Sequence, residues 1–229
     1  MSLLDPIFQL AELGGPVLMI LVAVSIGTLA LVLNKAWQYQ TERVGQNAPI
    51  RHALALWDRG DKAGARAALV GLRHFIAPVI ESGMALDGRT DAAERLESEA
   101  EQRILPLEKG FRILDTVAQL APLLGLLGTV LGMIEAFQAL QEAGSQVDPA
   151  ALAGGIWVAL LTTAAGLAVA MPTSMALSWF EARIDSERAL ADYALKVLAS
   201  PGLATESGMA PSAEASPALP AQTPQPHGA

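Results

Sequence analysis

Two long apolar stretches dominate the hydrophobic pattern of this chain, over residues 117–140 and 151–177. About 20 helical residues cross the roughly 30 Å core of a bilayer, so each stretch is long enough to span a membrane. A third apolar run, residues 16–33, is just long enough to do the same. The pattern therefore predicts an all-α integral membrane protein whose three transmembrane helices cover residues 16–36, 116–141 and 151–180.

The first apolar run could be mistaken for a secretory signal. No Lys or Arg precedes it, however, whereas Asp5 and Glu12 do. A signal peptide opens with a positively charged region and has a shorter apolar segment followed by a cleavage site of small residues. We therefore expect a transmembrane helix that is retained in the mature protein.

The polar segments between and after the apolar stretches predict long helices that extend out of the membrane and a small helical module over residues 37–115. Asp61 is typical of an N-cap and should start an alanine-rich helix that reaches about Leu72. Residues 181–199 should continue the third span as a polar helix. Residues 200–229 are rich in Pro, Ala and Ser and lack the apolar content to fold, which predicts a disordered tail.

A longer helix of the module should begin at Thr90 or Asp91, where Asp91 and Glu94 form a capping-box-like pair. We expect this helix to bend at Pro106 and to run on into the second span. Glu108 and Arg112 lie four residues apart, so they can pair on its exposed face. Such charges usually mark a solvated helix face, and the alternative is a surface between subunits.

The charge pattern predicts the orientation of the chain. All fifteen Lys and Arg residues fall within residues 35–112 and 183–196. Three crossings place these two segments on the same side, which the positive-inside rule makes the cytoplasm. The N-terminal residues 1–15 and the connector 142–150 are then expected outside, and the C-terminus inside.

Composition narrows the function classes. Only 17% of the residues are charged, against about 25% in a soluble domain. The chain has no cysteine and three scattered histidines, which argues against a disulfide framework, a thiol nucleophile or a metal site. Phosphate-binding and nucleophile-elbow motifs are missing, and the balance of charge does not favour nucleic-acid binding. We expect neither an enzyme nor a cofactor.

Small residues and hydroxyls gather on one face of each of the two long spans. At about 100° per residue, one face of the second span holds Gly125, Gly128, Thr129, Gly132 and Ala136. The corresponding face of the third span holds Ala159, Thr163, Gly166 and Ala170, while Thr162 points about 100° away. Lipid-facing positions are normally filled by larger apolar residues, so these faces are expected to contact protein or water.

Two interpretations of these faces stay open. In the first, the small residues form a helix-packing seam, and each threonine bonds a carbonyl of its own helix. In the second, Thr129 and Thr163, each near the centre of its span, line a hydrated ion path that forms when several copies assemble. The second interpretation makes these two threonines the candidate pore-lining residues.

Glu135 is the ionisable residue that lies well inside an expected span. An intramembrane carboxylate is a candidate functional group by default. It lies about 9 Å along the helix axis from Thr129, toward the outer side, and points about 120° away from it. Glu135 is therefore a candidate for the pathway or its outer mouth, and the alternative is a side chain that simply reaches water.

The segments LAPLLGLLGTVLGMIEAF and GGIWVALLTTAAGLAVAMP resemble the ExbB/TolQ/MotA family of energy-transducing membrane proteins. Their paired motifs, A-P-x-x-G-L-x-G-T-V-x-G and T-x-x-G-L-x-x-x-x-P, recur together in few other contexts. The resemblance extends over most of residues 5–195, and the three-span plan is most similar to the ExbB and TolQ branches.

This resemblance implies a bacterial inner-membrane protein with a periplasmic N-terminus that acts as a stator and proton-channel subunit. It implies a pentamer around a dimer of a single-span ExbD-like partner, whose aspartate carries the proton, and a TonB-like protein that energises outer-membrane transport. Thr129 and Thr163 match the two pore-facing threonines of the family. Val158 departs from the pattern, since many relatives carry Glu there.

Two other functions remain as alternatives. A TolQ-like subunit of the Tol-Pal envelope-maintenance system would use the same machine with different partners. A non-conducting membrane scaffold would use the small faces for packing alone. A solute permease lacks support, because the spans show no inverted repeat.

Overall fold

The computed structural model describes residues 5–86, 93–143 and 149–202, and within these ranges every regular element is an α-helix. In chain order the helices are α1 Asp5–Thr41, α2 Ala48–Asp58, α3 Lys62–Leu69, α4 Ala77–Leu86, α5 Ala93–Glu108, α6 Phe111–Ala143 and α7 Pro149–Ala199. The predicted all-α fold class is confirmed. The predicted cap at Asp91, the connector around residues 144–148 and the tail from residue 203 lie outside the described residues.

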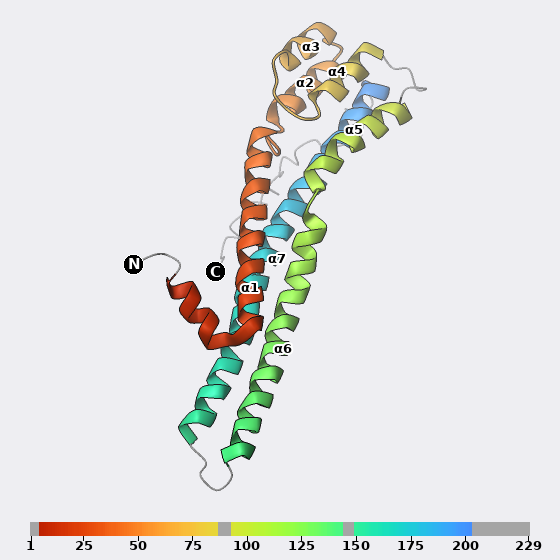
Figure 1. Cartoon of the computed structure of the whole chain (residues 1–229). Helices are drawn as coiled ribbons and strands as arrows, with labels where there is room; N and C mark the ends of the chain where they lie inside the picture. Colours follow the sequence, from red (N-terminus) through yellow and green to blue (C-terminus); the bar gives the residue numbers. More distant parts are fainter. Residues whose placement is uncertain (1–4, 87–92, 144–148, 203–229) are drawn as a thin grey trace, which may run out of the picture.

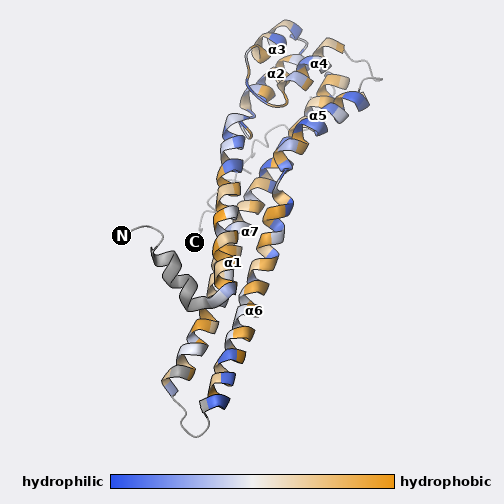
Figure 2. Ribbon diagram, in the orientation of Figure 1, coloured by the Kyte–Doolittle hydropathy of each residue, from blue (hydrophilic) through white to orange (hydrophobic). Residues whose placement is uncertain are grey.

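Three of these helices are long and apolar enough to cross a membrane by length and composition: Gly15–Thr41 of α1, Phe111–Glu142 of α6 and Leu152–Ala199 of α7. They run side by side, with α6 and α7 forming an antiparallel hairpin that extends past the bend in α1 (Figure 1). Apolar residues predominate along these three helices, whereas polar residues are more frequent in α2–α5 and at the connector end of α6 (Figure 2). The protein is therefore a three-span membrane protein.

A sharp bend divides α1 near its start. Gly15 has φ 63 and ψ −168, a conformation that residues with a Cβ rarely adopt. Pro16 follows, and a proline is well tolerated in the first turn of a helix because its missing N–H would be unbonded there. The segment before Gly15 therefore turns across the axis of the rest of α1 (Figure 1).

Pro106 does not end the helix, as predicted, because α5 contains it, but the predicted continuation into the second span is wrong. The structure ends α5 at Glu108 and begins α6 at Phe111, because Gly110 adopts a left-handed conformation with φ 96. Lys35 of α1, 3% exposed, stabilises this break from outside the segment. Its Nζ donates to the carbonyl of Pro106 at 3.3 Å and to that of Leu107 at 3.0 Å.

The short helices follow the expected capping. Asp61 caps α3 as predicted, since its Oδ1 accepts a hydrogen bond from the Gly64 N–H at 2.8 Å. The helix ends at Leu69 rather than near Leu72, because Val70 leaves the helical conformation.

A single apolar core joins α2–α5 to the far end of α7, and we call α2–α5 the helical module. Its largest buried side chains include Trp57, Leu54, Ile80 and Ile104. The last turns of α7 contribute buried residues from Ile184 to Leu198, so the third apolar helix runs directly into the module. Residues 181–199 carry charged side chains every few positions and therefore lie beyond the apolar span.

Candidate functional site

The small residues of α6 and α7 pack directly against each other within one chain. A Cβ placed on Gly125 would lie 2.8 Å from the backbone oxygen of Thr162, and one placed on Gly166 would lie 2.5 Å from the backbone oxygen of Ala121. Real Cβ atoms essentially never come closer than 3.0 Å to such atoms. Only glycine permits this approach of the two backbones, as in small-residue seams of membrane helices.

The same seam continues toward the α6–α7 connector. Gly132 faces Ala159, whose Cβ would lie 3.0 Å from an added Cβ, and Gly155 faces Ala136 at 2.8 Å. At the other end, Ala170 is buried in a small cluster with Ala121 and with residues of α1. The two small-residue faces found by periodicity thus meet each other as one intramolecular seam.

Thr163 and Thr129 occupy different surroundings in this seam. Thr163 is half-buried, and its Oγ1 donates to the Gly125 carbonyl on α6 at 3.2 Å. Thr129 is also half-buried, and its Oγ1 donates to the carbonyl of Leu126 in its own helix at 2.7 Å. Both hydroxyls therefore bond backbone carbonyls while part of each side chain stays open at the surface of the single chain.

Thr162 belongs to the seam, although helical periodicity predicts that it points about 100° away from Thr163. It is 2% exposed, and its Oγ1 donates to the carbonyls of Ala159 at 2.7 Å and Gly125 at 3.2 Å. An added Cβ on Gly128 would lie 2.5 Å from that hydroxyl oxygen. The i, i+3 spacing of Ala159 and Thr162 was the sequence signal for this placement.

The remaining candidates lie apart from the seam. Glu135 is exposed on α6, and Val158 is half-buried on α7. Among the residues that the structure describes, no group of three or more His, Asp or Glu side chains is placed to hold a metal ion. The arrangement offers hydroxyls and backbone carbonyls, which can bind water or pass a proton, rather than a nucleophile.

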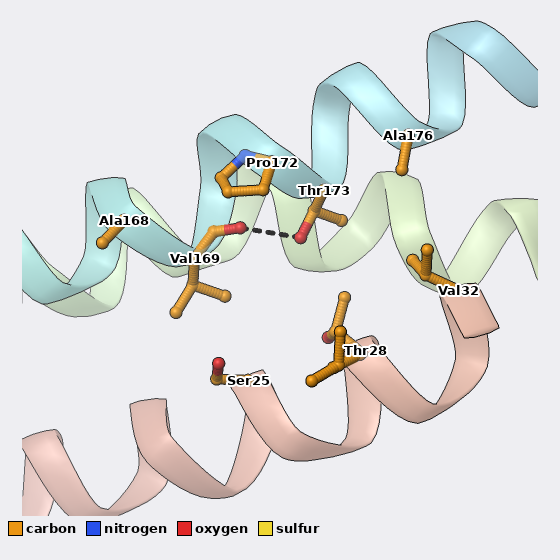
Figure 3. Close-up of a pocket in the computed structure, with 9 residues that line it drawn as sticks. Ser25, Thr28, Val32, Ala168, Val169, Pro172, Thr173 and Ala176 are labelled. Carbon is orange, nitrogen blue, oxygen red and sulfur yellow. Dashed lines mark hydrogen bonds between the residues drawn. The ribbon is translucent and has the colours of Figure 1, made fainter.

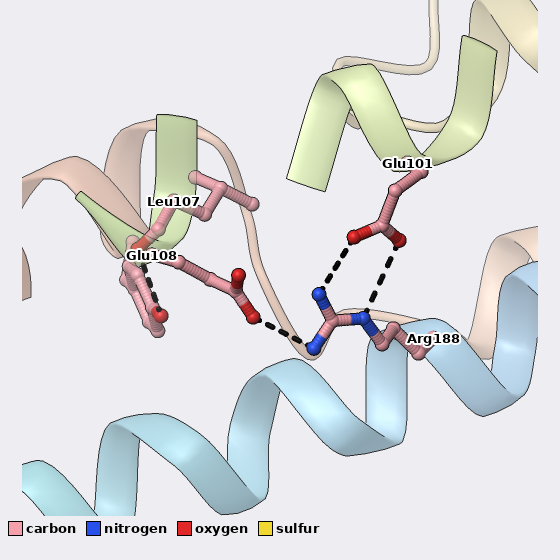
Figure 4. A network of polar contacts seen from close by, with 5 residues as sticks. Glu101, Leu107, Glu108 and Arg188 are labelled. Carbon is pink, nitrogen blue, oxygen red and sulfur yellow. Dashed lines mark hydrogen bonds and ion pairs between the residues drawn. The ribbon is translucent and has the colours of Figure 1, made fainter. Parts of the chain in front are cut away.

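A charged cluster that sequence reasoning missed ties α5 to α7 (Figure 4). The Arg188 guanidinium donates to both carboxylate oxygens of Glu101, the shorter contact being 2.7 Å, and also lies 2.7 Å from Glu108. Glu108 was predicted to pair with Arg112. That pairing is replaced because the break at Gly110 ends the helix that would have carried both residues.

A buried pair of titratable groups joins α7 to the helical module. Glu187 is fully buried, accepts a hydrogen bond from the Gly45 N–H at 2.5 Å, and lies 3.8 Å from His74 Nε2. Burial lowers the pKa of His74 to about 4, and burial raises the pKa of Glu187 despite the Gly45 N–H and the nearby Arg183. The imidazole is therefore neutral at pH 7, and its contact with Glu187 is polar rather than ionic.

Replacing Glu187 by glutamine is expected to stabilise the protein increasingly as the pH rises above 4.5, the ordinary pKa of this carboxyl. Between that value and the raised pKa of the folded group, the unfolded chain ionises the carboxyl while the folded chain still holds its proton, so the native protein loses stability as the pH rises through this interval. Glutamine keeps the acceptor for Gly45 and does not titrate. The gain should grow by up to about 1.4 kcal/mol per pH unit, measured by urea unfolding between acidic and neutral pH.

The matched control for this experiment is Glu181→Gln, since Glu181 lies on the same helix and is exposed. It makes the same chemical change outside the buried contact with Gly45 and His74. A Glu187→Gln difference that stays constant across the titration would contradict a raised pKa at this position.

Comparison with known proteins connects these features to one family. A family model described as the MotA/TolQ/ExbB proton channel family matches residues 71–192. A relative named as an ExbB homolog from Methanothermobacter thermautotrophicus is 30% identical over 186 residues, which cover 79% of this chain and 65% of the relative. This chain thus spans about two thirds of that relative's length.

Two further relatives carry different names. Biopolymer transport protein ExbB of Neisseria meningitidis serogroup B is 30% identical over 185 residues, covering 73% of this chain and 84% of the relative. Tol-Pal system protein TolQ of Haemophilus influenzae is 40% identical over 85 residues, covering 37% of each chain. The likeness to an ExbB-named protein is therefore longer, and the likeness to TolQ is confined to a shorter segment.

Proposed function

Because this chain belongs to the MotA/TolQ/ExbB proton channel family, which is a family of channels rather than of enzymes, we propose that it is the stator subunit of a proton-driven motor. The motor would lie in the bacterial inner membrane and energise transport across the outer membrane. In this proposal a pentamer of the chain surrounds a dimer of an ExbD-like single-span protein, which acts on a TonB-like protein.

One observation carries the proposal. The apolar spans place hydroxyls at mid-depth but no carboxylate, since residues 117–134 and 152–180 contain no ionisable side chain. Thr129 and Thr163 are both partly open at the surface of the single chain. A proton path along them needs a carboxylate from elsewhere, and the helix of a single-span partner with an aspartate would supply it.

The orientation in the proposal follows from the charges. All the Lys and Arg residues fall within residues 35–112 and 183–196, and the positive-inside rule assigns these two segments to the cytoplasm. The N-terminus and the α6–α7 connector then face the periplasm. Glu135, exposed on α6 near the connector, would lie toward the periplasmic mouth of the path.

An ExbB-like role is preferred over a TolQ-like one because the similarity to ExbB-named relatives extends over most of the chain. A role in the Tol-Pal system is the alternative within the family. A second candidate of another class is a non-conducting scaffold. It is favoured by the seam itself, in which the hydroxyls of Thr162 and Thr163 both bond the Gly125 carbonyl.

The test is a pair of isosteric substitutions, Thr129→Val and Thr163→Val, in the complex with the single-span partner reconstituted in liposomes. Valine keeps the shape but can neither donate nor accept a proton, so proton flux should fall about tenfold or more in each variant. Native mass spectrometry of the same preparations should show an unchanged five-to-two assembly.

Thr116→Val is the matched control, because Thr116 also lies on α6 and its hydroxyl bonds the Arg112 carbonyl in its own helix at 2.7 Å. It should leave the flux unchanged. Normal flux in both the Thr129 and the Thr163 variants, with assembly intact, would exclude the hydroxyl path, whereas a native complex that assembles but carries no proton flux would favour the scaffold.

A further inference from the structure

A cavity of about 230 Å³ lies between α1 and α7, apart from the α6–α7 seam. It is lined from α1 by Ser25, Thr28, Leu29 and Val32, and from α7 by Ala168, Val169, Pro172, Thr173 and Ala176 (Figure 3). Ser25 and Thr28 lie within the apolar run of the first span, so the cavity lies at the depth of the lipid chains. A cavity at this depth is expected to be lined by apolar atoms alone, yet three of its residues carry hydroxyls.

Two of these hydroxyls have no hydrogen-bond partner among the residues that the structure describes. Thr28 is only 7% exposed, and neither its Oγ1 nor that of Ser25 bonds another group in this part of the chain. Figure 3 shows the Ser25 hydroxyl directed into the space toward Val169. Thr173 differs, because its Oγ1 donates to the Val169 carbonyl at 2.7 Å.

Pro172 removes a backbone donor from the helix wall of the same cavity. A proline has no N–H, so the carbonyl four residues earlier, that of Ala168, lacks its helical donor. Both residues line the cavity. A hydroxyl or carbonyl left unbonded in an apolar medium costs several kcal/mol, so groups at this depth are expected to be satisfied by some polar partner.

We propose that this cavity is a hydrated site, in which a small cluster of water molecules bridges the Ser25 and Thr28 hydroxyls and the Ala168 carbonyl. The volume accommodates several waters, each of which takes about 30 Å³, and a bound water needs two to four polar partners. A lipid chain or an apolar side chain of another copy would fill the space but leave all three groups unbonded. This inference does not depend on the proposed function.

The absence of native cysteine makes the site directly testable in the full-length protein. Ser25→Cys and Thr28→Cys each place a thiol in the cavity, and Ile26→Cys places one on the neighbouring face of α1, where Ile26 is 58% exposed. Open membrane fragments that expose both faces would be treated with a positively charged methanethiosulfonate reagent. Only a thiolate in water reacts, so the two cavity thiols should react about tenfold or more faster than the control.

A second variant tests whether the reaction of the thiol depends on the open cavity. Ser25→Leu in the Thr28→Cys background fills the cavity and should reduce the reaction rate of the thiol to that of the Ile26→Cys control. Cavity thiols that react only with an uncharged maleimide would show a cavity filled by lipid or by another copy, and would overturn the proposal. Equal fast reaction at Ile26→Cys would also overturn it, because the whole face of α1 would then be in water.

Discussion

Gly125→Leu is expected to prevent the α6–α7 hairpin from closing and to remove the protein from the membrane by proteolysis. Even a single added carbon at Gly125 would lie 2.8 Å from the Thr162 backbone oxygen and 3.0 Å from the Thr163 Cα. Backbone atoms cannot rotate away as a side chain can, so the cost should exceed the usual 1–3 kcal/mol of overpacking, at about 3 kcal/mol or more. The measurement is the amount of full-length protein in isolated membranes, with thermal unfolding in detergent.

Gly154→Leu is the matched control, since an added Cβ at Gly154 meets nothing within 4 Å. It lies on α7 and should accumulate like the native protein. Normal accumulation and unfolding of Gly125→Leu would show that the helices do not approach as closely as the seam requires.

Phe180→Ala is expected to lower the free energy of unfolding by about 3–5 kcal/mol, as for other fully buried aromatic residues. Phe180 is 2% exposed and lies where α1, α6 and α7 leave the apolar spans. Its ring packs edge-on against Tyr39 of α1 at 5.1 Å and stacks on Phe111 of α6 at 6.1 Å between ring centroids. Deleting it leaves a cavity at a place where all three long helices share aromatic contacts.

Unfolding of this variant can be followed by tryptophan fluorescence in detergent. Met175→Ala is the control on the same helix, because Met175 is 75% exposed and should cost little. If the two substitutions destabilised the protein equally, the aromatic contact would not hold the helices together.

The three spans were predictable from the sequence because their signal is local: each needs only an uninterrupted apolar run of sufficient length. The all-α fold class follows from the same signal, and the Asp61 cap follows from one side chain and its next three residues. These features do not depend on which distant residues come to lie beside them, which is why local pattern was sufficient.

Features set by distant contacts were missed. Pro106 suggested a bend, but the break falls at Gly110, where Lys35 from α1 bonds the last carbonyls of α5. Sequence spacing pairs Glu108 with Arg112, whereas the ion pair that forms is with Arg188 of α7. Thr162 lies off the face that periodicity predicts around Thr163, but the seam is wide enough to bury Thr162 and to half-bury Thr163. Helical periodicity gives a direction, and it does not give the width of a contact.

The 51 residues of α7 form one unbroken helix from the connector end of the hairpin to the core of the helical module. At 1.5 Å per residue this is a rod about 75 Å long. A rod of this length acts as a lever: a tilt of about 5° at one end displaces the other by roughly 6 Å, more than one helical turn. A change of tilt in the membrane half of α7 therefore moves the helical module as well. A spin label placed after Leu198, at the module end of α7, would register small changes of tilt within the bilayer as large displacements.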